Sequence, residues 1–493
     1  MVQRTHIMEL ETIFLGKTYD DFLVRPQEGV VRSRRDIGLT TRLTRQLTLA
    51  LPVVSANMDS VTEAAMAKTL ALEGGIGFIH RGMSIEGQAR EVTQVKRSHG
   101  FVVEQPLCLP KGTTMRDARA FLRQHAITGL LIEETAGSHI LAGVLSNRDI
   151  PWREDAENQP VEAFMTPVEE LHTGAPGISG DEAARVLFAH RLEKLPLIDT
   201  NRRIHGLITK KDLILYRQRP HASTDAKGRL LVGAAVGVRG DYLERAAELV
   251  RAGADVILMD VAHGHSKVMQ QAVESFRKQF EATALICGNV GTAEGACFLQ
   301  ALGVDGIKVG IGPGRGCRTR LETAAGVPQL QAIREAWCAV GEAVPLIADG
   351  GIKHDKDIFL ALICGASAVM LGSLLAGTDE APGTVITDPA TGHKTKLYRG
   401  MTSPQAVFEA LYDGEEQTEL VEALQTPPEG QQMQVAYQGS VVDVLHRLRG
   451  HLRSAVSYAG GHTLAEMRER IVRDPLRALI PLSEAARRES YER

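Results

Sequence analysis

Residues 230–260 read LLVGAAVGVRGDYLERAAELVRAGADVILMD, in which two short apolar runs flank a longer amphipathic one. The apolar runs, LLVGAAVG and DVILMD, are typical of buried parallel strands, which have no polar face. The run between them, GDYLERAAELVRAG, places its apolar residues three and four positions apart, as on one face of a helix. The stretch predicts a strand–helix–strand unit of a parallel α/β fold.

The same alternation recurs along the chain and indicates about eight strand–helix units. The candidate strands are residues 51–58, 75–80, 230–237, 255–260, 284–290, 306–312, 345–351 and 367–373. Such a series predicts a (β/α)8 TIM barrel, whose chemistry lies at the carboxyl ends of its strands. Polar residues or glycines stand at those ends, as this fold requires: Asn57, His80, Asp260, Asn289, Gly312, Asp349 and Ser373.

A segment with a different pattern lies between the second and third strands. Within it, GLLIEETAGSHILAGVLSNRDI (129–150) and LPLIDTNRRIHGLITKKDLI (195–214) share one order of strand, turn, strand and Ser/Thr-x-Arg/Lys-Asp. The hydroxyl and carboxylate of that last motif suit the start of a helix. Two such copies resemble a tandem pair of CBS modules, a Bateman domain, which implies binding of regulatory purine nucleotides such as ATP or GTP. A spacer that only sets oligomer geometry is the alternative.

These patterns divide the chain into three parts. Residues 1–99 form the first part of the barrel, 100–220 the tandem CBS domain, and 221–493 the rest of the barrel. The barrel pattern stops at about residues 380–440, and a connection of that length predicts an active-site flap.

The composition excludes several classes of protein. A net charge of −4 and an aromatic content of 4% give no basis for nucleic-acid binding. No run approaches the roughly 18 apolar residues of a membrane span, and the amino terminus has no apolar signal region. The six cysteines show no CxxC pair or zinc-ligand spacing, which predicts a reduced, cytoplasmic protein.

A glycine-rich loop with a cysteine follows the strand at 306–312, in IKVGIGPGRGCRTR (307–320). Backbone N–H groups of such a loop converge on an anion such as phosphate. Arg315 and Arg318 add positive charge, which favours the thiolate form of Cys317. An inert buried thiol is the usual state of a single cysteine, but the strand-end position favours a nucleophile here.

A second anion site is predicted where the last two strands end. The pairs Gly350–Gly351 and Gly372–Ser373 stand at those ends, where barrels bind phosphate through backbone amides. Asp349 precedes the first pair and suits a ribose diol, so a nucleoside monophosphate is the predicted ligand. His263 and His265 in DVAHGHS (260–266) are expected to contact substrate or cofactor rather than metal, because no third ligand follows them.

Eight stretches together are similar to the IMP dehydrogenase/GMP reductase family, over about residues 10–460. They are NMDSVTEAAMAKTLALEGGIGFIH, RPHASTDAKGRLLVGAAVGV, DVAHGHS, GNVGTAEGA, VGIGPGRGCRTR, IADGGIKHDKDI, VMLGSLLAGTDEAPG and YRGM.

The resemblance implies a role for each matching residue. It implies that Cys317 attacks C2 of the purine to form a thioimidate, with Thr319 and Glu429 as further catalytic groups. Substrate contacts are implied for Met58, Asp349, Gly351, Gly372, Ser373, Tyr398, Met401 and Arg315. Contacts on the nicotinamide side are implied for Asp260, Ala262, Asn289 and Gly310. A monovalent cation such as K+ on the carbonyl groups of Gly312, Gly314 and Cys317, and a homotetramer or octamer, are implied in the same way.

The family performs two reactions, and the flap separates them. Dehydrogenases oxidise IMP with NAD and hydrolyse the intermediate with an Arg–Tyr pair on the flap, as the resemblance implies. Between Arg399 and Tyr437 this sequence has no arginine, and Tyr412 in LYDGEE has acidic neighbours.

Smaller features point both ways. Thr402 after Gly400–Met401 and Val261 in DVAHG are closer to the reductase pattern, whereas the CBS pair, the chain length and the final GHS of DVAHGHS are closer to dehydrogenases. The sequence predicts an NADPH-dependent GMP reductase that converts GMP to IMP and ammonia. IMP dehydrogenase is the alternative.

The glycine-rich loop departs from the family at two positions. Arg315 stands where the family has a phosphate-binding Ser, and Gly316 where it has a small apolar residue. This departure leaves open a purine-nucleotide-binding paralogue with an altered substrate.

Overall fold

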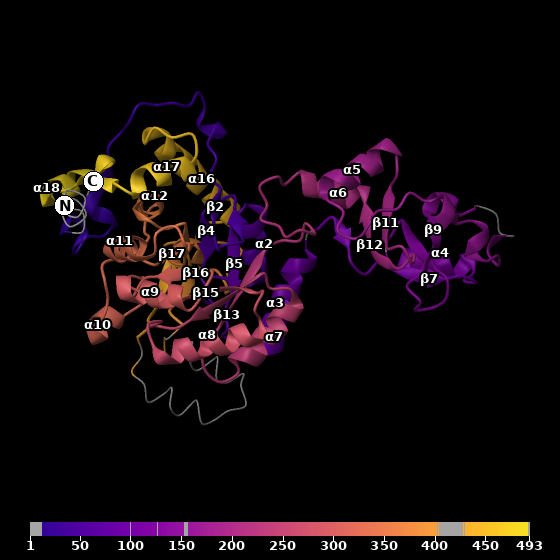
Figure 1. Ribbon diagram of the computed structural model, residues 1–493, viewed down its shortest axis with the longest axis horizontal. Helices are drawn as coiled ribbons and strands as arrows, with labels where there is room; N and C mark the ends of the chain where they lie inside the picture. The colour runs from indigo at the N-terminus through magenta and orange to yellow at the C-terminus, as the bar shows by residue number, and fades with distance from the viewer. Residues whose placement is uncertain are drawn as a thin grey trace. The chain divides into compact units, whose positions relative to one another are not determined.

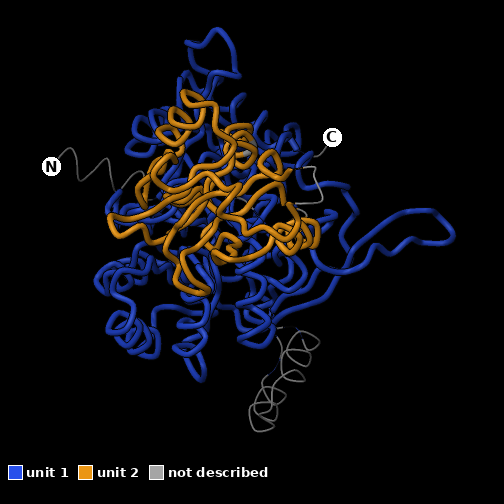
Figure 2. The backbone as a smooth tube through the Cα atoms, turned by 90° about the vertical axis from the view of Figure 1, so that its right-hand side faces the viewer, with its two compact units in different colours: residues 1–98, 221–223, 230–493 blue, residues 99–220, 224–229 orange. Residues whose placement is uncertain are grey.

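The computed structural model describes residues 12–98, 100–125, 127–151, 156–401, 403, 427 and 429–491. The chain divides into two compact units, coloured blue and orange in Figure 2. The first comprises residues 1–98, 221–223 and 230–493, and the second 99–220 and 224–229. Among the described helices, none has the length and apolar character needed to cross a membrane.

Eight parallel strands close into a barrel in the first unit (Figure 1). In barrel order they are β13 (Val232–Val236), β14 (Val256–Asp260), β15 (Ala284–Val290), β16 (Gly306–Val309), β17 (Leu346–Asp349), β18 (Ala368–Leu371), β4 (Val53–Ser55) and β5 (Ile76–Ile79). Neighbouring strands pair in parallel, for example Ile257 with Leu285 and Ile307 with Leu346. The predicted α/β TIM barrel is confirmed, and each strand lies within the range predicted for it.

Amphipathic helices surround the strands and bury their apolar faces. They are α2 (Ala64–Leu72), α3 (Ile85–Arg97), α7 (Tyr242–Ala252), α8 (Lys267–Gln279), α9 (Ala293–Ala301), α11 (Gln329–Val340), α12 (Asp355–Cys364) and α16 (Val441–Tyr458). Only the short α13 (Ser373–Ala376) directly follows β18. The eighth position is taken by α16, which packs against α12 and α2 after a long intervening segment.

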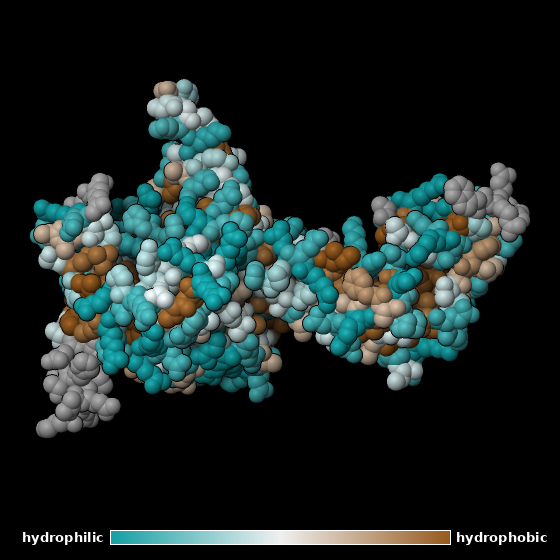
Figure 3. Space-filling view, turned by 90° about the horizontal axis from the view of Figure 1, so that it is seen from above, coloured by the Kyte–Doolittle hydropathy of each residue, from teal (hydrophilic) through white to brown (hydrophobic). Residues whose placement is uncertain are grey.

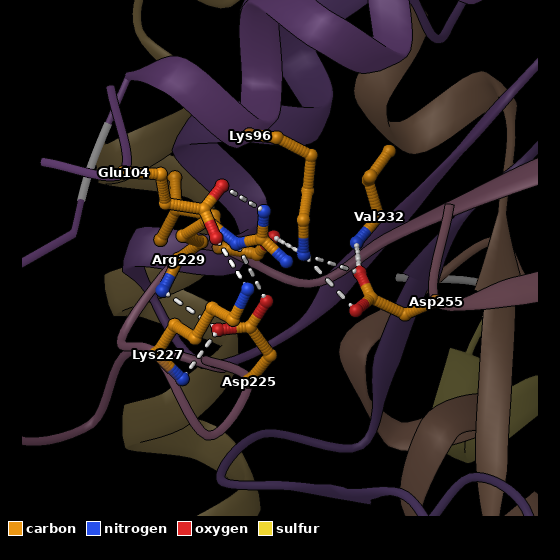
Figure 4. A network of polar contacts seen from close by, with 8 residues as sticks. Lys96, Glu104, Asp225, Lys227, Arg229, Val232 and Asp255 are labelled. Carbon is orange, nitrogen blue, oxygen red and sulfur yellow. Dashed lines mark hydrogen bonds and ion pairs between the residues drawn. The ribbon is translucent and has the colours of Figure 1, made fainter. Parts of the chain in front are cut away.

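Apolar side chains fill the barrel, and a buried ion pair fixes the amino ends of two strands. Lys96, at the end of α3, donates to both oxygens of Asp255 at 3.0 Å, and Asp255 Oδ2 accepts the Val232 N–H at 2.8 Å (Figure 4). These contacts hold β13 and β14 side by side. On the face drawn in Figure 3 the surface is mostly hydrophilic, with hydrophobic residues in scattered patches.

The segment predicted as a flap contains a sheet in its described part. Strands β19 (Ile386–Thr387), β20 (Lys394–Arg399) and β21 (Gln432–Ala436) pair antiparallel in that order. Residues 404–426, including Tyr412, and Thr402 lie outside the described residues. The sheet was not expected, because the polar composition of this segment resembles that of a loop. Its buried positions are few, among them Lys396, Tyr398 and Val435.

The remaining elements of the first unit lie outside the barrel wall. Two short antiparallel pairs are formed by β1 (Phe22–Val24) with β22 (Leu479–Pro481) and by β2 (Thr41–Arg42) with β3 (Thr48–Leu49). The short helices are η1 (Tyr19–Asp21), η2 (Arg34–Asp36), α10 (Thr319–Thr323), α17 (Leu464–Val472), η7 (Pro475–Arg477) and α18 (Glu484–Tyr491).

The second unit contains the repeated pattern as two antiparallel hairpins. Its elements are β6 (Val102–Val103), β7 (Cys108–Pro110), α4 (Met115–Gln124), β8 (Gly129–Glu133), β9 (Leu141–Ser146), η3 (Asn147–Asp149), η5 (Val161–Ala163), β10 (Thr166–Pro167), η6 (Val168–Glu170), α5 (Gly180–Ala189), β11 (Lys194–Ile198), β12 (Ile204–Thr209) and α6 (Lys210–Arg217). The hairpins are β8–β9 and β11–β12, and each packs on a hydrophobic core of its own.

Side-chain contacts at the hairpin ends repeat as well. The Ser146 hydroxyl donates to Asp149 at 2.7 Å, and the Thr209 hydroxyl donates to Asp212 at 2.5 Å. In this unit Arg229 also donates to Glu104 at 2.8 Å and to Asp225 at 3.0 Å (Figure 4). The CBS assignment stays a prediction that these features support.

Candidate active site

A cavity of about 770 Å³ opens at the carboxyl ends of the barrel strands. Its lining comes from the ends of β4, β14, β15, β16, β17 and β18 and from the β20–β21 sheet. The site residues implied by the family resemblance line it: Met58, Asp260, Ala262, Asn289, Gly310, Gly312, Gly314, Arg315, Cys317, Thr319, Asp349, Gly351, Gly372, Ser373, Tyr398, Met401 and Glu429. Strand-end residues that lie far apart in the sequence therefore meet in one place.

One wall of the cavity is the loop at 310–319, here called the glycine loop. It begins at Gly310, whose φ of 147° no other residue type adopts readily, and where a Cβ would lie 2.1 Å from the Asp349 carbonyl oxygen. The Cys317 N–H donates to the Gly314 carbonyl at 3.0 Å, which forms a turn around Arg315 and Gly316. The loop then enters α10 at Thr319.

A chain of three polar side chains links the thiol to a carboxylate. Cys317 Sγ and Thr319 Oγ1 are 3.2 Å apart, and Thr319 Oγ1 donates to Glu429 Oε2 at 2.6 Å. Because the threonine proton is directed to the carboxylate, its oxygen can accept a proton from the thiol. The arrangement provides a route for a proton between Cys317 and Glu429.

Backbone hydrogen bonds fix Glu429 in this position. The Arg318 N–H donates to the Glu429 carbonyl at 2.7 Å, and the Gln431 N–H donates to the Gly316 carbonyl at 2.9 Å. Cys317 and Gly430 pair as an antiparallel bridge between these two bonds. Residues 429–431 are thus aligned along the glycine loop like an added strand.

The two arginines of the glycine loop differ. Arg318 pairs with Glu322 at 2.6 Å and does not line the cavity. Arg315 lines the cavity, is exposed, and has no recorded side-chain partner among the described residues. Two arginines are predicted to favour the thiolate of Cys317. Of these two, only Arg315 faces the cavity, because Arg318 is paired with Glu322.

The predicted anion-binding residues converge beside Arg315. A Cβ on Gly350 would lie 3.0 Å from the Gly314 nitrogen, and one on Gly372 would lie 2.8 Å from the Tyr398 hydroxyl. The pKa of Tyr398 is raised, chiefly by burial and then by Asp349, while Arg315 opposes this shift. Its hydroxyl therefore stays protonated at neutral pH and can donate to a ligand.

The end of β20 is tied to the loop after β4. Arg399 donates to Asp59 Oδ2 through Nε at 2.8 Å and pairs through Nη2 at 2.7 Å. The Asp59 N–H contacts Met401 Sδ at 3.4 Å, and the Tyr398 hydroxyl lies 3.7 Å from Met58 Sδ. These contacts bring the two predicted base-binding methionines to the same side of the cavity.

Beside the start of the glycine loop lies a group of five side chains, here called the strand-end cluster. Lys308 Nζ lies 2.6 Å from Asp349 Oδ2 and 2.9 Å from Asp260 Oδ1. Asn57 and Asn289 donate to the second oxygen of Asp260 and to Asp349 Oδ2, at 2.7 and 3.0 Å. Burial alone would lower the pKa of Lys308, but the two carboxylates more than offset this and raise it.

The sequence did not single out several lining residues, among them Arg81, Lys308, Lys353, His354 and Gln438. A signal existed for Lys308, because a lysine inside the apolar run of β16 is costly to bury without a partner. Conversely, His263 and His265 were expected at the site and do not line the cavity.

Across the described ranges, no group of three or more His, Cys, Asp or Glu side chains is arranged to hold a metal. The Gly314 carbonyl already accepts the Cys317 N–H, and a cation on it stays a prediction.

A family model described as IMP dehydrogenase / GMP reductase domain matches residues 16–492. The chain belongs to this family. It is an oxidoreductase of the IMP dehydrogenase/GMP reductase type, as the resemblance implied.

Similar proteins carry both names of the family. Proteins named inosine-5'-monophosphate dehydrogenase are 43% identical in Nitrosopumilus maritimus, over 92% of this chain and 94% of that protein, and 44% identical in Streptococcus pyogenes, over 93% of each. A GMP reductase structure from Trypanosoma brucei, a cysteine-to-alanine variant in complex with guanosine 5'-monophosphate, matches with a TM-score of 0.79 and 38% identity, over 96% of each chain. The same enzyme in complex with guanosine 5'-triphosphate matches with a TM-score of 0.69 and 34% identity, over 94% of this chain and 97% of that one.

Proposed function

We propose that this protein is a GMP reductase, which converts GMP to IMP and ammonia with NADPH as reductant. The observation that carries the proposal is the chain from Cys317 through Thr319 to Glu429, taken with the sequence around Glu429. Residues 400–437 contain no arginine, lysine or histidine. The cationic group that dehydrogenases of this family use to activate water is therefore missing from the segment that would carry it.

The cavity suits a purine nucleoside monophosphate. The phosphate would lie against Gly351, Gly372, Ser373 and Arg315, where backbone N–H groups and a guanidinium converge. The ribose diol would donate to Asp349, whose Oδ1 has no recorded partner among the described residues. Met58 and Met401 would pack against the base.

The cavity also continues beyond the residues assigned to the nucleotide. Asp260, Ala262, Asn289 and Gly310 line this continuation and would hold the nicotinamide end of the dinucleotide. When bound, the reduced dinucleotide supplies the hydride that replaces the amino group at C2. NADPH is proposed over NADH by analogy with reductases of the family.

The three linked side chains account for the proton movements. Cys317 would attack C2, and its proton would pass through Thr319 to Glu429 over the contacts of 3.2 and 2.6 Å. The C2–N bond would then break, and Glu429 would return the proton through Thr319 to the departing nitrogen as ammonia. Arrival of the hydride at C2 would then break the C2–S bond and release IMP and the Cys317 thiolate. One carboxylate thus serves as base and then as acid, and no activated water is needed.

IMP dehydrogenase remains the second candidate, because the curated relatives at 43–44% identity carry that name. The decisive experiment measures turnover with the four pairings of GMP or IMP with NADPH or NAD. We expect loss of NADPH and release of ammonia with GMP. Faster formation of NADH and XMP from IMP and NAD would reverse the assignment. Nucleotide binding without turnover in any pairing would identify a binding paralogue.

We also propose that the second unit is a CBS pair that binds regulatory purine nucleotides. The repeated hairpins, with a hydroxyl-to-aspartate contact at each end, support this. So does a neighbour solved with guanosine 5'-triphosphate. A homotetramer or octamer in the cytoplasm and a K+ requirement are proposed from the family. Activity assays with ATP, GTP and K+ test the regulation and the cation.

A further inference from the structure

Lys308 lines the cavity with an almost fully buried side chain and takes no part in the chemistry proposed above. Its side chain is 3% exposed, whereas those of Asp260 and Asp349 are 24% and 22% exposed toward the cavity they line. The three side chains come from β16, β14 and β17. A single buried ammonium group thus bridges two carboxylates that belong to different halves of the site.

The other bonds to these carboxylates come from neutral groups. Asn57 donates to Asp260 Oδ2 at 2.7 Å. Asn289 donates to Asp349 Oδ2 at 3.0 Å and to the Gly310 carbonyl at 2.7 Å. Among the described residues, Lys308 is therefore the only cation bonded to either carboxylate.

Other titratable groups nearby do not replace that cation. Tyr398 and Tyr19 both sense the charge of Asp349, but burial raises the pKa of each, so both are neutral at physiological pH. The remaining charged or titratable groups that line the cavity are Arg81, Arg315, Cys317, Lys353, His354 and Glu429. No contact of these six with Asp260 or Asp349 is recorded among the described residues.

Two carboxylates this close repel each other when both are ionised. Their bonded oxygens lie 2.9 and 2.6 Å from the same nitrogen. Without the ammonium group, this repulsion would favour the neutral form of one of the pair, as in other sites where two carboxylates share a small volume. A protonated Asp349 would present a hydroxyl donor to the ribose in place of a charged acceptor.

We propose that Lys308 is a positioning residue that keeps Asp349 and Asp260 ionised together, so that the ribose-binding and cofactor-side carboxylates depend on one buried charge. The proposal rests on the proposed function, because it takes Asp349 as the acceptor of the ribose diol. It adds that Lys308 acts through the protonation state of Asp349 and not by touching the nucleotide.

The test compares nucleotide binding by wild-type protein and Lys308→Met, without cofactor, between about pH 6 and pH 8. Isothermal titration gives the Kd for GMP and for IMP with each protein at each pH. For each nucleotide, the ratio of the variant Kd to the wild-type Kd cancels the effect of phosphate titration. We expect binding by the variant to be about tenfold weaker at the acid end, with the ratio falling as pH rises. Guanosine, which lacks the phosphate, should show the same trend.

The double variant Asp260→Asn/Lys308→Met separates this role from a merely structural one. Removal of the second carboxylate abolishes the repulsion, so Asp349 should ionise again. We expect binding to recover to within about threefold of Asp260→Asn, with a flat pH dependence. Because this variant carries no unpaired like charges, its comparison with Asp260→Asn remains informative if Lys308→Met does not fold.

Two outcomes would overturn the role of Lys308. One is a Kd ratio that does not change with pH, and the other is a double variant that binds no better than Lys308→Met. Wild-type protein that binds neither GMP nor IMP would instead overturn the proposed function and this inference with it. Tight binding without reductase turnover would overturn the reductase assignment and leave Lys308 to be judged by the ratios.

Discussion

The strand-end cluster and the glycine loop line one cavity next to each other, but different interactions hold them in place. The cluster consists of side chains on four barrel strands and one residue that follows a fifth, and an ion pair to Lys308 joins its two carboxylates. The glycine loop is positioned by its own backbone and by residues 429–431, with Thr319 and Glu429 as its side-chain contacts. The proposed binding groups of the cluster therefore come from the barrel, and the proposed reacting groups come from a loop that a second segment supports.

This difference predicts two kinds of variant. Changes in the glycine loop should reduce turnover more than nucleotide binding, whereas changes in the strand-end cluster should act first on binding. Four substitutions test the loop side, and the Lys308 variants test the other.

The largest effect is expected for Cys317→Ala. The variant loses the nucleophile, so turnover should fall by at least about 10³-fold. GMP should still bind within a few-fold of wild type, because the strand-end cluster is unchanged. Steady-state rates and isothermal titration measure the two quantities. Cys297→Ala, at an exposed cysteine of α9, is the control and should retain both. Retained turnover in Cys317→Ala would remove the covalent mechanism.

Glu429→Gln should have the next largest effect. The amide cannot take the proton that Thr319 relays, which should cost about 10²- to 10⁴-fold in kcat. The KM for GMP should change little. The matched control is Glu322→Gln, which removes a carboxylate from the adjacent helix that only pairs with Arg318. Equal losses of kcat in Glu429→Gln and Glu322→Gln would show that the electrostatic field at the glycine loop matters and that proton transfer through Thr319 does not.

Arg315→Ser should affect binding, although it lies in the loop. Loss of a charged contact to the phosphate should raise the KM for GMP by about tenfold, with kcat nearly unchanged. Raised salt should weaken GMP binding to wild type more than binding to the variant. Arg318→Ser removes the same charge from a residue that Glu322 already neutralises and should have a smaller effect. An unchanged KM in Arg315→Ser would place the phosphate elsewhere.

Gly316→Ala should have the smallest effect. An added Cβ would lie 3.1 Å from the Gly400 nitrogen and 3.3 Å from Tyr398 Cε1, so the loop and β20 must move slightly apart. We expect a loss of roughly fivefold in kcat/KM. Gly314→Ala is the comparison, because its Cβ would meet only Cys317 Cβ at an ordinary 3.6 Å. A larger loss in Gly314→Ala would show that backbone freedom at that position outweighs the space at Gly316.

The barrel and most of the cavity lining could be predicted from the sequence. Parallel strands in a barrel end on one face, so Asp260, Asn289 and Asp349 had to meet once their strands were recognised. Glu429 was found only through the resemblance, since no local pattern brings it to Cys317. Its actual support, a bridge between Cys317 and Gly430, spans more than a hundred residues of sequence.

The two carboxylate partners of Lys308 could not be predicted from the sequence. A lysine between Ile307 and Val309 indicates that something unusual is buried there, but the partner is 41 residues away and a second carboxylate shares it. Pairing of this kind depends on which strands are neighbours and which side chains face inward. The position of α16 could not be predicted from the sequence for a similar reason. This helix completes the barrel, but the β19–β21 sheet separates it from β18 along the chain.

The position of α16, far along the chain from β18, has a consequence for how proteins of this family can diversify. The chain between β18 and α16 leaves the barrel and returns to it at fixed points, since α13 follows β18 directly and α16 packs between α12 and α2. Glu429 is carried on this connection. The proposed acid–base partner of the thiol can therefore be exchanged by altering one tethered segment, without redesign of the barrel that carries the proposed nucleotide contacts.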